Sequence, residues 1–358
     1  MAAWPDRRLL DLFGIDLPII QAPMGGPGTP QLAVAVSEAG GLGSLACAQL
    51  TSIQIREAVN TIRLGTSRSI NLNFFCHTPP DVDRARLLAW RARLAPYYVE
   101  QGLDPDAPLA PPSATPFNAE SCSLVEEFTP QVVSFHLGLP DPSLLDRVKA
   151  TGARVIGAAT TVREARWLEE RGCDAIIAMG LEAGGHRGIF MSTDISRQVG
   201  TFALVPQVAD AVRVPVIAAG GVADARGIVA ALALGASAVQ MGTAYLFCPE
   251  AKVTAVYREA LKTAADDDTM LTNVFTGRPA RGIVNRLMLE IGPISADAPG
   301  FPLASSAVVP LAAKSAAAGS RDFTSLWSGQ AARLARELPA GELTRVLAAE
   351  ALAKLAAF

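Results

Sequence analysis

The feature that most constrains the fold is a repeat in which a short β-like run is followed by a stretch with helical spacing of apolar residues. Eight such runs occur, and a helical pattern separates most neighbouring runs. Strands that alternate with helices predict a parallel sheet with helices packed outside it. The runs cover residues 18–21, 41–45, 69–73, 132–136, 154–158, 175–178, 214–219 and 238–241, and the helical patterns cover 31–39, 53–64, 143–150, 161–171, 202–212 and 223–234.

Two folds place helices between parallel strands, namely an open doubly wound sheet and a closed barrel. The count of eight favours the barrel. The first run is not followed by a G-x-G-x-x-G turn, which an open dinucleotide-binding sheet would usually carry. We therefore predict an α/β protein built on a TIM (β/α)8 barrel.

Two regions interrupt the repeat. The segment between His77 and Phe128 is too long for a simple loop and contains a proline-rich stretch, so we interpret it as an insertion after strand 3. The alanine-rich chain after strand 8 is predicted to be a helical extension that forms a second, smaller domain or lid. The predicted division gives 1–77 and 120–250 to the barrel, and 78–119 and 251–358 to the insertion and the substrate or lid region.

Composition excludes several classes of function. Hydrophobic residues make up 50% of the chain and the net charge is only -3, with no basic stripe that would indicate a nucleic-acid partner. No run of about 18 apolar residues predicts a membrane span, and the N-terminus does not resemble a signal peptide. Five scattered cysteines without a C-x-x-C pair predict reduced thiols, a cytoplasmic protein and no metal site.

All three histidines of the chain fall on the predicted catalytic face, at the carboxyl ends of the strands. His136 ends strand 4, His77 lies just beyond strand 3, and His186 follows two glycines in the loop after strand 6. A histidine in such a glycine loop can act as a base or as a hydrogen-bond donor to developing negative charge. The alternative is a flexible loop with an exposed histidine.

Glycine-rich turns follow the last two strands. Gly220 and Gly221 come after strand 7, and Gly242 and Thr243 end strand 8. These are the two loops that usually bind phosphate in this architecture, although glycines can also simply turn the chain. Phosphosugars, pyridoxal phosphate and flavin mononucleotide (FMN) would all fit, but pyridoxal phosphate needs a lysine at a strand end, and none is found.

Two further segments complete the predicted barrel mouth. Asn71 and Asn73 lie one strand period apart on the same face, so we expect one of them to point into the mouth. A buried amide there needs a partner, and the edge of a flavin ring offers both donors and acceptors. Strand 1 ends in IQAPMGG.

These segments together resemble the nitronate monooxygenase family, formerly called 2-nitropropane dioxygenases, which are FMN-dependent barrels. The likeness extends over nearly the whole chain. The matching strings are IQAPMGG at 20–26, AGGLGSL at 39–45, EAGGHRG at 182–188, AAGGVADARG at 218–227, VQMGT at 239–243, TGRPARGIVNRLM at 276–288 and SLWSGQ at 325–330.

The resemblance implies a metal-free enzyme that binds FMN and oxidises alkyl nitronates, and in some cases nitroalkanes, with O2 to a carbonyl compound and nitrite. His186 matches the family's catalytic histidine, and we interpret His136 and His77 as substrate-binding residues. The predicted cofactor-binding residues are Ala22, Pro23, Met24, Asn73, Gly184, Gly185, Gly220, Gly221, Gln240, Met241, Gly242 and Thr243.

The sequence departs from the family pattern at three places. Met179 stands where the family usually has a glutamine that contacts the flavin, Phe301 stands in a region that carries tyrosines in nitronate-specific members, and His77 is not general in the family. These differences concern the substrate more than the flavin.

Two alternative functions remain at this stage. One is an NAD(P)H-dependent flavin reductase, such as an enoyl-acyl-carrier-protein reductase-like enzyme or a quinone reductase. The other is a flavin-binding protein without turnover. The expected partners are a small-molecule substrate and O2, and the sequence leaves a homo-oligomer open.

Overall fold

The barrel predicted from the repeat is confirmed. The computed structural model of the chain describes residues 4–112 and 114–357. Eight parallel strands form one sheet in the order β1-β9-β8-β6-β5-β4-β3-β2, and a parallel bridge between Ile20 and Leu42 joins its two edges into a barrel. The strands are β1 (Ile19–Gln21), β2 (Gly43–Ala46), β3 (Ile70–Phe75), β4 (Val132–His136), β5 (Arg154–Ala159), β6 (Ala175–Met179), β8 (Val216–Ala219) and β9 (Ala238–Met241).

Helices surround the barrel, and side-chain caps fix where most of them begin. Thr29 accepts a hydrogen bond from the N–H of Leu32, and Thr51 and Gln54 form a capping box. All six predicted helical patterns form helices, whereas α5 was not predicted. The helices around the barrel are α2 (Pro30–Glu38), α3 (Ser52–Gly65), α5 (Ala119–Phe128), α6 (Pro142–Ala150), α7 (Val162–Glu170), α8 (Thr201–Ala211), α9 (Ala225–Ala233) and α13 (Ala340–Leu355).

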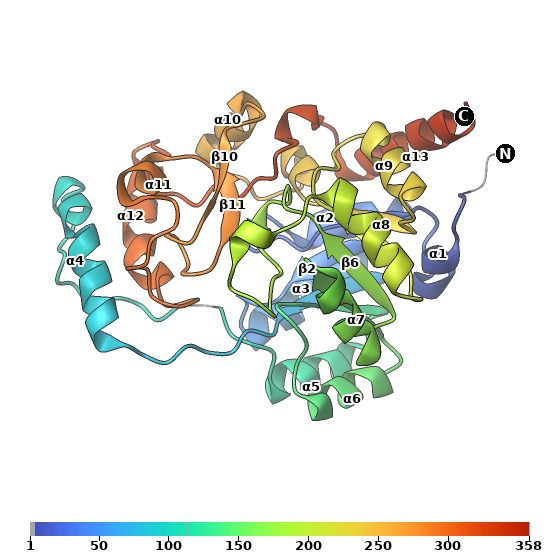
Figure 1. The fold of residues 1–358 in the computed structure, drawn as a ribbon, viewed down its shortest axis with the longest axis horizontal. Helices are drawn as coiled ribbons and strands as arrows, with labels where there is room; N and C mark the ends of the chain where they lie inside the picture. The colour runs from blue at the N-terminus through green and yellow to red at the C-terminus, as the bar shows by residue number, and fades with distance from the viewer. Residues whose placement is uncertain (1–3, 113, 358) are drawn as a thin grey trace.

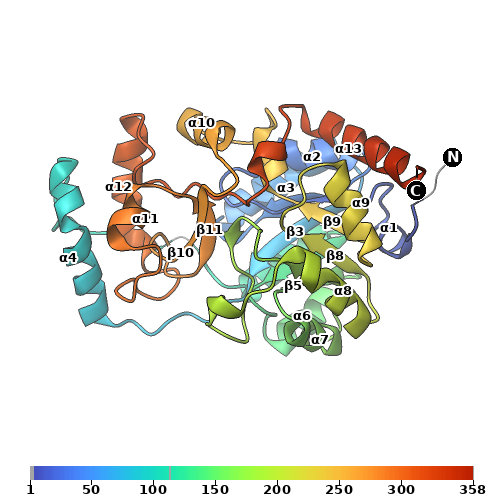
Figure 2. The same ribbon diagram turned by 45° about the horizontal axis from the view of Figure 1, so that its top comes forward.

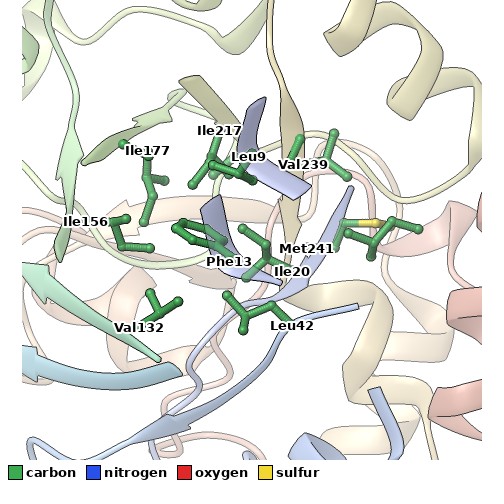
Figure 3. Close-up of a cluster of buried hydrophobic side chains, with 14 of the residues drawn as sticks. Leu9, Phe13, Ile20, Leu42, Val132, Ile156, Ile177, Ile217, Val239 and Met241 are labelled. Carbon is green, nitrogen blue, oxygen red and sulfur yellow. The ribbon is translucent and has the colours of Figure 1, made fainter. Parts of the chain in front are cut away.

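The barrel interior is filled with side chains rather than open. Parallel strands covered on both faces are apolar almost throughout, and all five residues of β6 are buried. Leu9 and Phe13 of the short helix α1 (Arg8–Phe13) are buried against this core and occupy its centre among strand residues such as Ile156 and Ile217 (Figure 3). The packed core leaves the carboxyl ends of the strands as the end where a site can form.

A second hydrophobic cluster lies beside the barrel, at the far left of Figures 1 and 2. Trp90 and Tyr98 of α4 bind the carbonyl groups of Ala304 and Ala307 at 3.2 and 2.7 Å, so the insertion packs against the C-terminal extension. A three-stranded antiparallel sheet, which the sequence analysis did not predict, joins this region to the barrel loops. The elements are α4 (Arg84–Glu100), β7 (Gly185–His186), α10 (Ala255–Thr263), β10 (Thr269–Thr272), β11 (Ala280–Ile283), α11 (Arg286–Ile291) and α12 (Ser305–Ala317), and the short 3-10 helices of the chain are η1 (Ile195–Arg197), η2 (Thr243–Phe247) and η3 (Ala332–Leu334).

The last helix differs from the expectation that the whole tail belongs to the lid region. α13 lies against α2 and α9, and its Leu343 and Leu347 are fully buried in the barrel cluster. The hydroxyl groups of Tyr245 and Thr344 form a buried hydrogen bond of 2.8 Å between η2 and α13. The tail therefore crosses the second cluster and returns to the barrel. Within the two described ranges, no helix is both long and apolar enough to span a membrane.

We predict that Gly43→Ala destabilises the barrel, because a Cβ at residue 43 would lie 2.0 Å from the carbonyl oxygen of Ala33 in α2. Overpacking against backbone that cannot move is expected to lower the free energy of unfolding by about 2 kcal/mol or more, measured by urea denaturation. Gly65→Ala is the matched control, since its Cβ would meet only the movable methyl groups of Val34 at 2.9 Å. Equal losses in the two variants would contradict the prediction.

Candidate active site

A cavity of about 220 Å³ lies at the carboxyl ends of the barrel strands. Most of the residues predicted from the sequence to bind cofactor or substrate line it, although they come from seven separate segments of the chain. Those that line it are Ala22, Pro23, Met24, Asn73, His136, Gly184, Gly185, His186, Gly220, Gly221, Gln240, Gly242 and Thr243.

Two predicted site residues do not line the cavity. The side chain of Met241 packs in the barrel core (Figure 3), and its carbonyl oxygen accepts a hydrogen bond from the N–H of Ala22. The buried ring of His77 packs edge-on against Phe301, with ring centroids 4.7 Å apart. Because β9 alternates its side chains, Gln240 faces the cavity and Met241 faces away, which the sequence analysis did not take into account.

The two asparagines of β3 occupy different depths. Asn73 lines the cavity, and its amide Nδ2 donates to the hydroxyl of Ser134 at 2.9 Å, which fixes the side chain against β4. Asn71 lies deeper and donates to Ser44 at 3.0 Å. Asn73 is therefore the asparagine that faces the barrel mouth, in line with the expectation that one of the two would do so.

The glycines after β8 and β9 shape one end of the cavity. Gly220 and Gly221 have φ values of 108° and 72°, a region that favours glycine. Asp224 caps α9 by accepting from the N–H groups of Arg226 and Gly227, so the start of this helix is already occupied. η2 begins after Gly242 without a side-chain cap. Uncapped N–H groups therefore lie at the Gly242 turn, not at the start of α9.

A segment from the C-terminal tail covers the glycine loop after β6. Gly329 and Gly184 lie so close that a Cβ on Gly184 would be 2.5 Å from the backbone nitrogen of Gly329. The N–H of Gly329 donates to the Thr243 hydroxyl at 2.9 Å, and Trp327 and Ala331 line the cavity on either side. The site is thus built jointly by the barrel and the tail.

Two buried arginines hold the chain between β6 and His186. Arg187 is fully buried and donates to the carbonyl groups of Met179 and Gly180 at 2.9 and 2.7 Å. Arg281 donates to the next carbonyl group, that of Leu181, at 3.0 Å. Three consecutive carbonyl groups are therefore bound by guanidinium groups, which fixes the position of the histidine loop.

The three histidines lie near one another, as predicted. The Nε2 of His136 lies 3.1 Å from the carbonyl oxygen of His186, and the Nε2 of His186 lies 3.0 Å from the Thr276 hydroxyl. The ring of Phe75 lies within 6.4 Å, centroid to centroid, of all three imidazoles. Aromatic rings therefore surround the imidazoles at this end of the cavity.

All three imidazoles are neutral at pH 7. Burial lowers the pKa of His77 and of His136 to about 4 and that of His186 to about 3. Burial is the largest cause of these values, and the positive charge of Arg278 contributes to all three. A neutral His186 can donate or accept a hydrogen bond and carries no positive charge.

Several residues of the site were not identified from the sequence. Phe75, Gln49 and Tyr257 line the cavity but stand in no distinctive motif. Trp327 and Arg278 belong to the two tail strings that match the family, so the signal was present, but the sequence gave no reason to place the tail at the barrel mouth. Met179 lines the cavity. This position was expected there, because the family usually carries at it a glutamine that contacts the flavin.

No metal centre is built into the part of the chain that the structure describes, since no three histidine, cysteine or acidic side chains come together there. All five cysteines are free thiols, and burial raises the pKa of Cys47 and Cys173 to about 12. These two thiols are therefore protonated and unsuited to nucleophilic chemistry.

Comparison with known proteins follows this geometry. The family model described as nitronate monooxygenase matches residues 6–350. This chain belongs to the nitronate monooxygenase family. It is 44% identical to a nitronate monooxygenase from Pseudomonas aeruginosa, over 96% of this chain and 98% of that protein, and 43% identical to one from Paraburkholderia phytofirmans, over 96% and 94%. The chain is accordingly an oxidoreductase.

Solved structures agree with this assignment. A nitroalkane oxidase from Streptomyces ansochromogenes superposes with a TM-score of 0.88 at 38% identity, covering 98% of this chain and 99% of that one. FabK from Thermotoga maritima superposes with a TM-score of 0.74 at 30% identity, covering 98% and 97%. Both superpositions therefore extend over the barrel and over the region beside it that holds the second cluster.

We predict that Arg187→Met destabilises the protein and loosens the histidine loop. The change removes the side-chain donors to the carbonyl groups of Met179 and Gly180 and to Gln198, although Gly180 keeps the N–H of Ala183, so we expect the free energy of unfolding to fall by about 3 kcal/mol. Arg187→Lys should recover only part of the loss, because one ammonium group does not reproduce the planar fork. Urea denaturation measures both variants, and wild-type stability in Arg187→Met would contradict the role of these bonds.

We also predict that protonation of the histidines destabilises the fold. Unfolded imidazoles have a pKa of about 6.5, whereas the folded values are about 4, 4 and 3. The unfolded chain therefore binds more protons below pH 6.5, so stability is complete above that pH and falls as the pH drops toward 4. Histidine NMR titration and urea unfolding at several pH values test this, and folded midpoints near 6.5 would contradict it.

Proposed function

We propose that the protein binds FMN and oxidises alkyl nitronates, and also nitroalkanes, with O2 to a carbonyl compound and nitrite. The observation that carries the proposal is one cavity with glycine turns at one end and neutral histidines among aromatic rings at the other. Membership of the nitronate monooxygenase family and the likeness to a nitroalkane oxidase support this assignment of the substrate.

The cavity fits a flavin at two places. The side-chain oxygen Oε1 of Gln240 is buried without a hydrogen-bond partner, so it can accept from an N–H of a flavin ring. Gly221 and Gly242 leave room for a phosphate, whose oxygens would accept from backbone N–H groups at the Gly242 turn. When bound, the flavin would accept electrons from the substrate, and this chain's residues would bind and orient both molecules.

His186 would serve the substrate in one of two ways. The Thr276 hydroxyl lies 3.4 Å from the carbonyl oxygen of Arg278 and donates toward it, so its oxygen is free to accept from Nε2–H of His186. That assignment, inferred from the hydrogen-bond network, leaves Nδ1 of His186 unprotonated. Nδ1 can then remove the proton next to the nitro group of a nitroalkane. A nitronate has already lost that proton and would need only binding and orientation.

We predict that His186→Asn lowers kcat/KM for nitroethane on the order of 10²-fold, because the base is lost. The loss with ethylnitronate should be smaller, about tenfold, since only a hydrogen bond disappears. Steady-state oxygen consumption with both substrates measures the two effects. Unchanged rates with both substrates would rule out a role for His186.

The proposed function is tested with purified protein reconstituted with FMN under anaerobic conditions. Ethylnitronate is expected to bleach the oxidised flavin absorbance, and NADPH alone is not. Rapid full bleaching by NADPH would instead support a flavin reductase, and failure to bind FMN would overturn the proposal. Admission of O2 should then yield nitrite in proportion to the nitronate consumed.

A further inference from the structure

Arg278 lies next to the histidines although it does not line the cavity. In the pairing of β11 with β7, Ala280 lies opposite His186, and the N–H of Arg187 donates to the carbonyl of Pro279 at 2.9 Å. Continuing this register places Arg278 opposite Gly188. A Cβ on Gly188 would lie 3.2 Å from the Cε1 of His136, so this strand pair borders the histidine end of the site directly.

The charge of Arg278 has no carboxylate partner among the residues that the structure describes. Its guanidinium donates to the carbonyl oxygen of Ile189, and its Nε is buried without any hydrogen-bond partner. The nearby acid Glu164 is already engaged, because its two oxygens accept from the backbone of Phe190 and Met191 and from Thr160. Glu164 attracts the guanidinium of Arg278 electrostatically but forms no ion pair with it, so this largely buried charge gains further from an anion that enters beside it.

We infer that Arg278 supplies the positive charge that makes this site select the anionic nitronate over the neutral nitroalkane. The inference rests on the proposed function and adds a specificity-determining residue to it. Arg278 does not line the cavity, so its charge acts on the substrate electrostatically, from the segment just before β11 that lies behind the histidines. A unit positive charge close to a partly buried site raises the affinity for an anion roughly tenfold or more.

The electrostatics of the histidines support this inference. The charge of Arg278 lowers the pKa of all three histidines. The charge of Arg187 also lowers the pKa of His136. His136 and His77 also lower the pKa of His186. The imidazoles remain neutral beside the guanidinium, so Arg278 retains its charge as the local cation. A nitronate entering this end would bring a negative charge close to Arg278, which attracts Glu164 without pairing with it.

The test compares kcat/KM for ethylnitronate with kcat/KM for nitroethane in reconstituted enzyme. Arg278→Met should lower the nitronate-to-nitroethane ratio about tenfold, and Arg278→Lys should keep most of it because the charge remains. Arg163→Gln is the matched control, since this exposed arginine donates to the neighbouring carbonyl of Met191 at 3.2 Å and its charge is screened. A ratio unchanged in Arg278→Met, or lowered equally in Arg163→Gln, would overturn the inference.

Histidine NMR provides a readout that does not depend on turnover. The chain has only three histidines, and Arg278→Gln should raise the pKa of all of them while Arg163→Gln should not. Absence of that rise would also overturn the inference. If wild-type protein does not oxidise nitronates at all, the proposed function fails, and the titration still decides whether Arg278 sets the charge of the site.

A further test uses the wild-type protein, so its result does not depend on whether an Arg278 variant folds. Nitrate is a planar, unreactive anion with the charge of a nitronate, so it should inhibit competitively against ethylnitronate. Nitrate inhibition should weaken about tenfold in whichever Arg278 variant folds. Absence of competition by nitrate in the wild type would overturn the inference.

Discussion

The hydrogen bonds from two arginines to three consecutive carbonyl groups after β6 are the constraint on which the site depends. Where the chain leaves a parallel strand, the ladder of hydrogen bonds ends, and buried carbonyl groups beyond it need other donors. Arg187 and Arg281 bind those of Met179, Gly180 and Leu181. The turn that follows needs two glycines to bring His186 back over the strands, and a turn of that composition would be mobile without these bonds. The loop is thus held both by these side chains and by the pairing of β7 with β11.

The same arginines make the environment of the site cationic, and its histidines respond by remaining neutral. Three imidazoles and three guanidinium groups lie close enough for their charges to interact. Glu182 and Glu164, the nearby acids, accept hydrogen bonds from backbone N–H groups and from the hydroxyls of Thr201 and Thr160. These bonds hold both carboxylates to the loops, and Glu182 also lines the cavity, whereas the three arginines lie behind its lining.

The sequence alone predicted the barrel well because each strand carries its own local signal. β4 and β9 have the bounds that were predicted, and the six helical patterns are all helices. The glycine turns and His186 were also found, because glycine loops at strand ends are visible in the sequence. The tail was harder, since β10 and β11 are short and become strands only by pairing with each other and, through β11, with Gly185 and His186. Arg278 and Trp327 reach the site through that long-range pairing, which no local pattern encodes.

The position of the segment 327–331 has a consequence for how the protein is made. Trp327 and Gly329 complete the cavity, and α13, which follows them, is packed on α2 near the start of the chain. During synthesis, every barrel strand is made before this segment, because the last of them, β9, ends at Met241. The nascent chain can therefore form its barrel strands early, whereas the cavity is complete only after the segment 327–331 has folded back onto the barrel. A cofactor held in this cavity would be enclosed only after that docking, not while the barrel assembles.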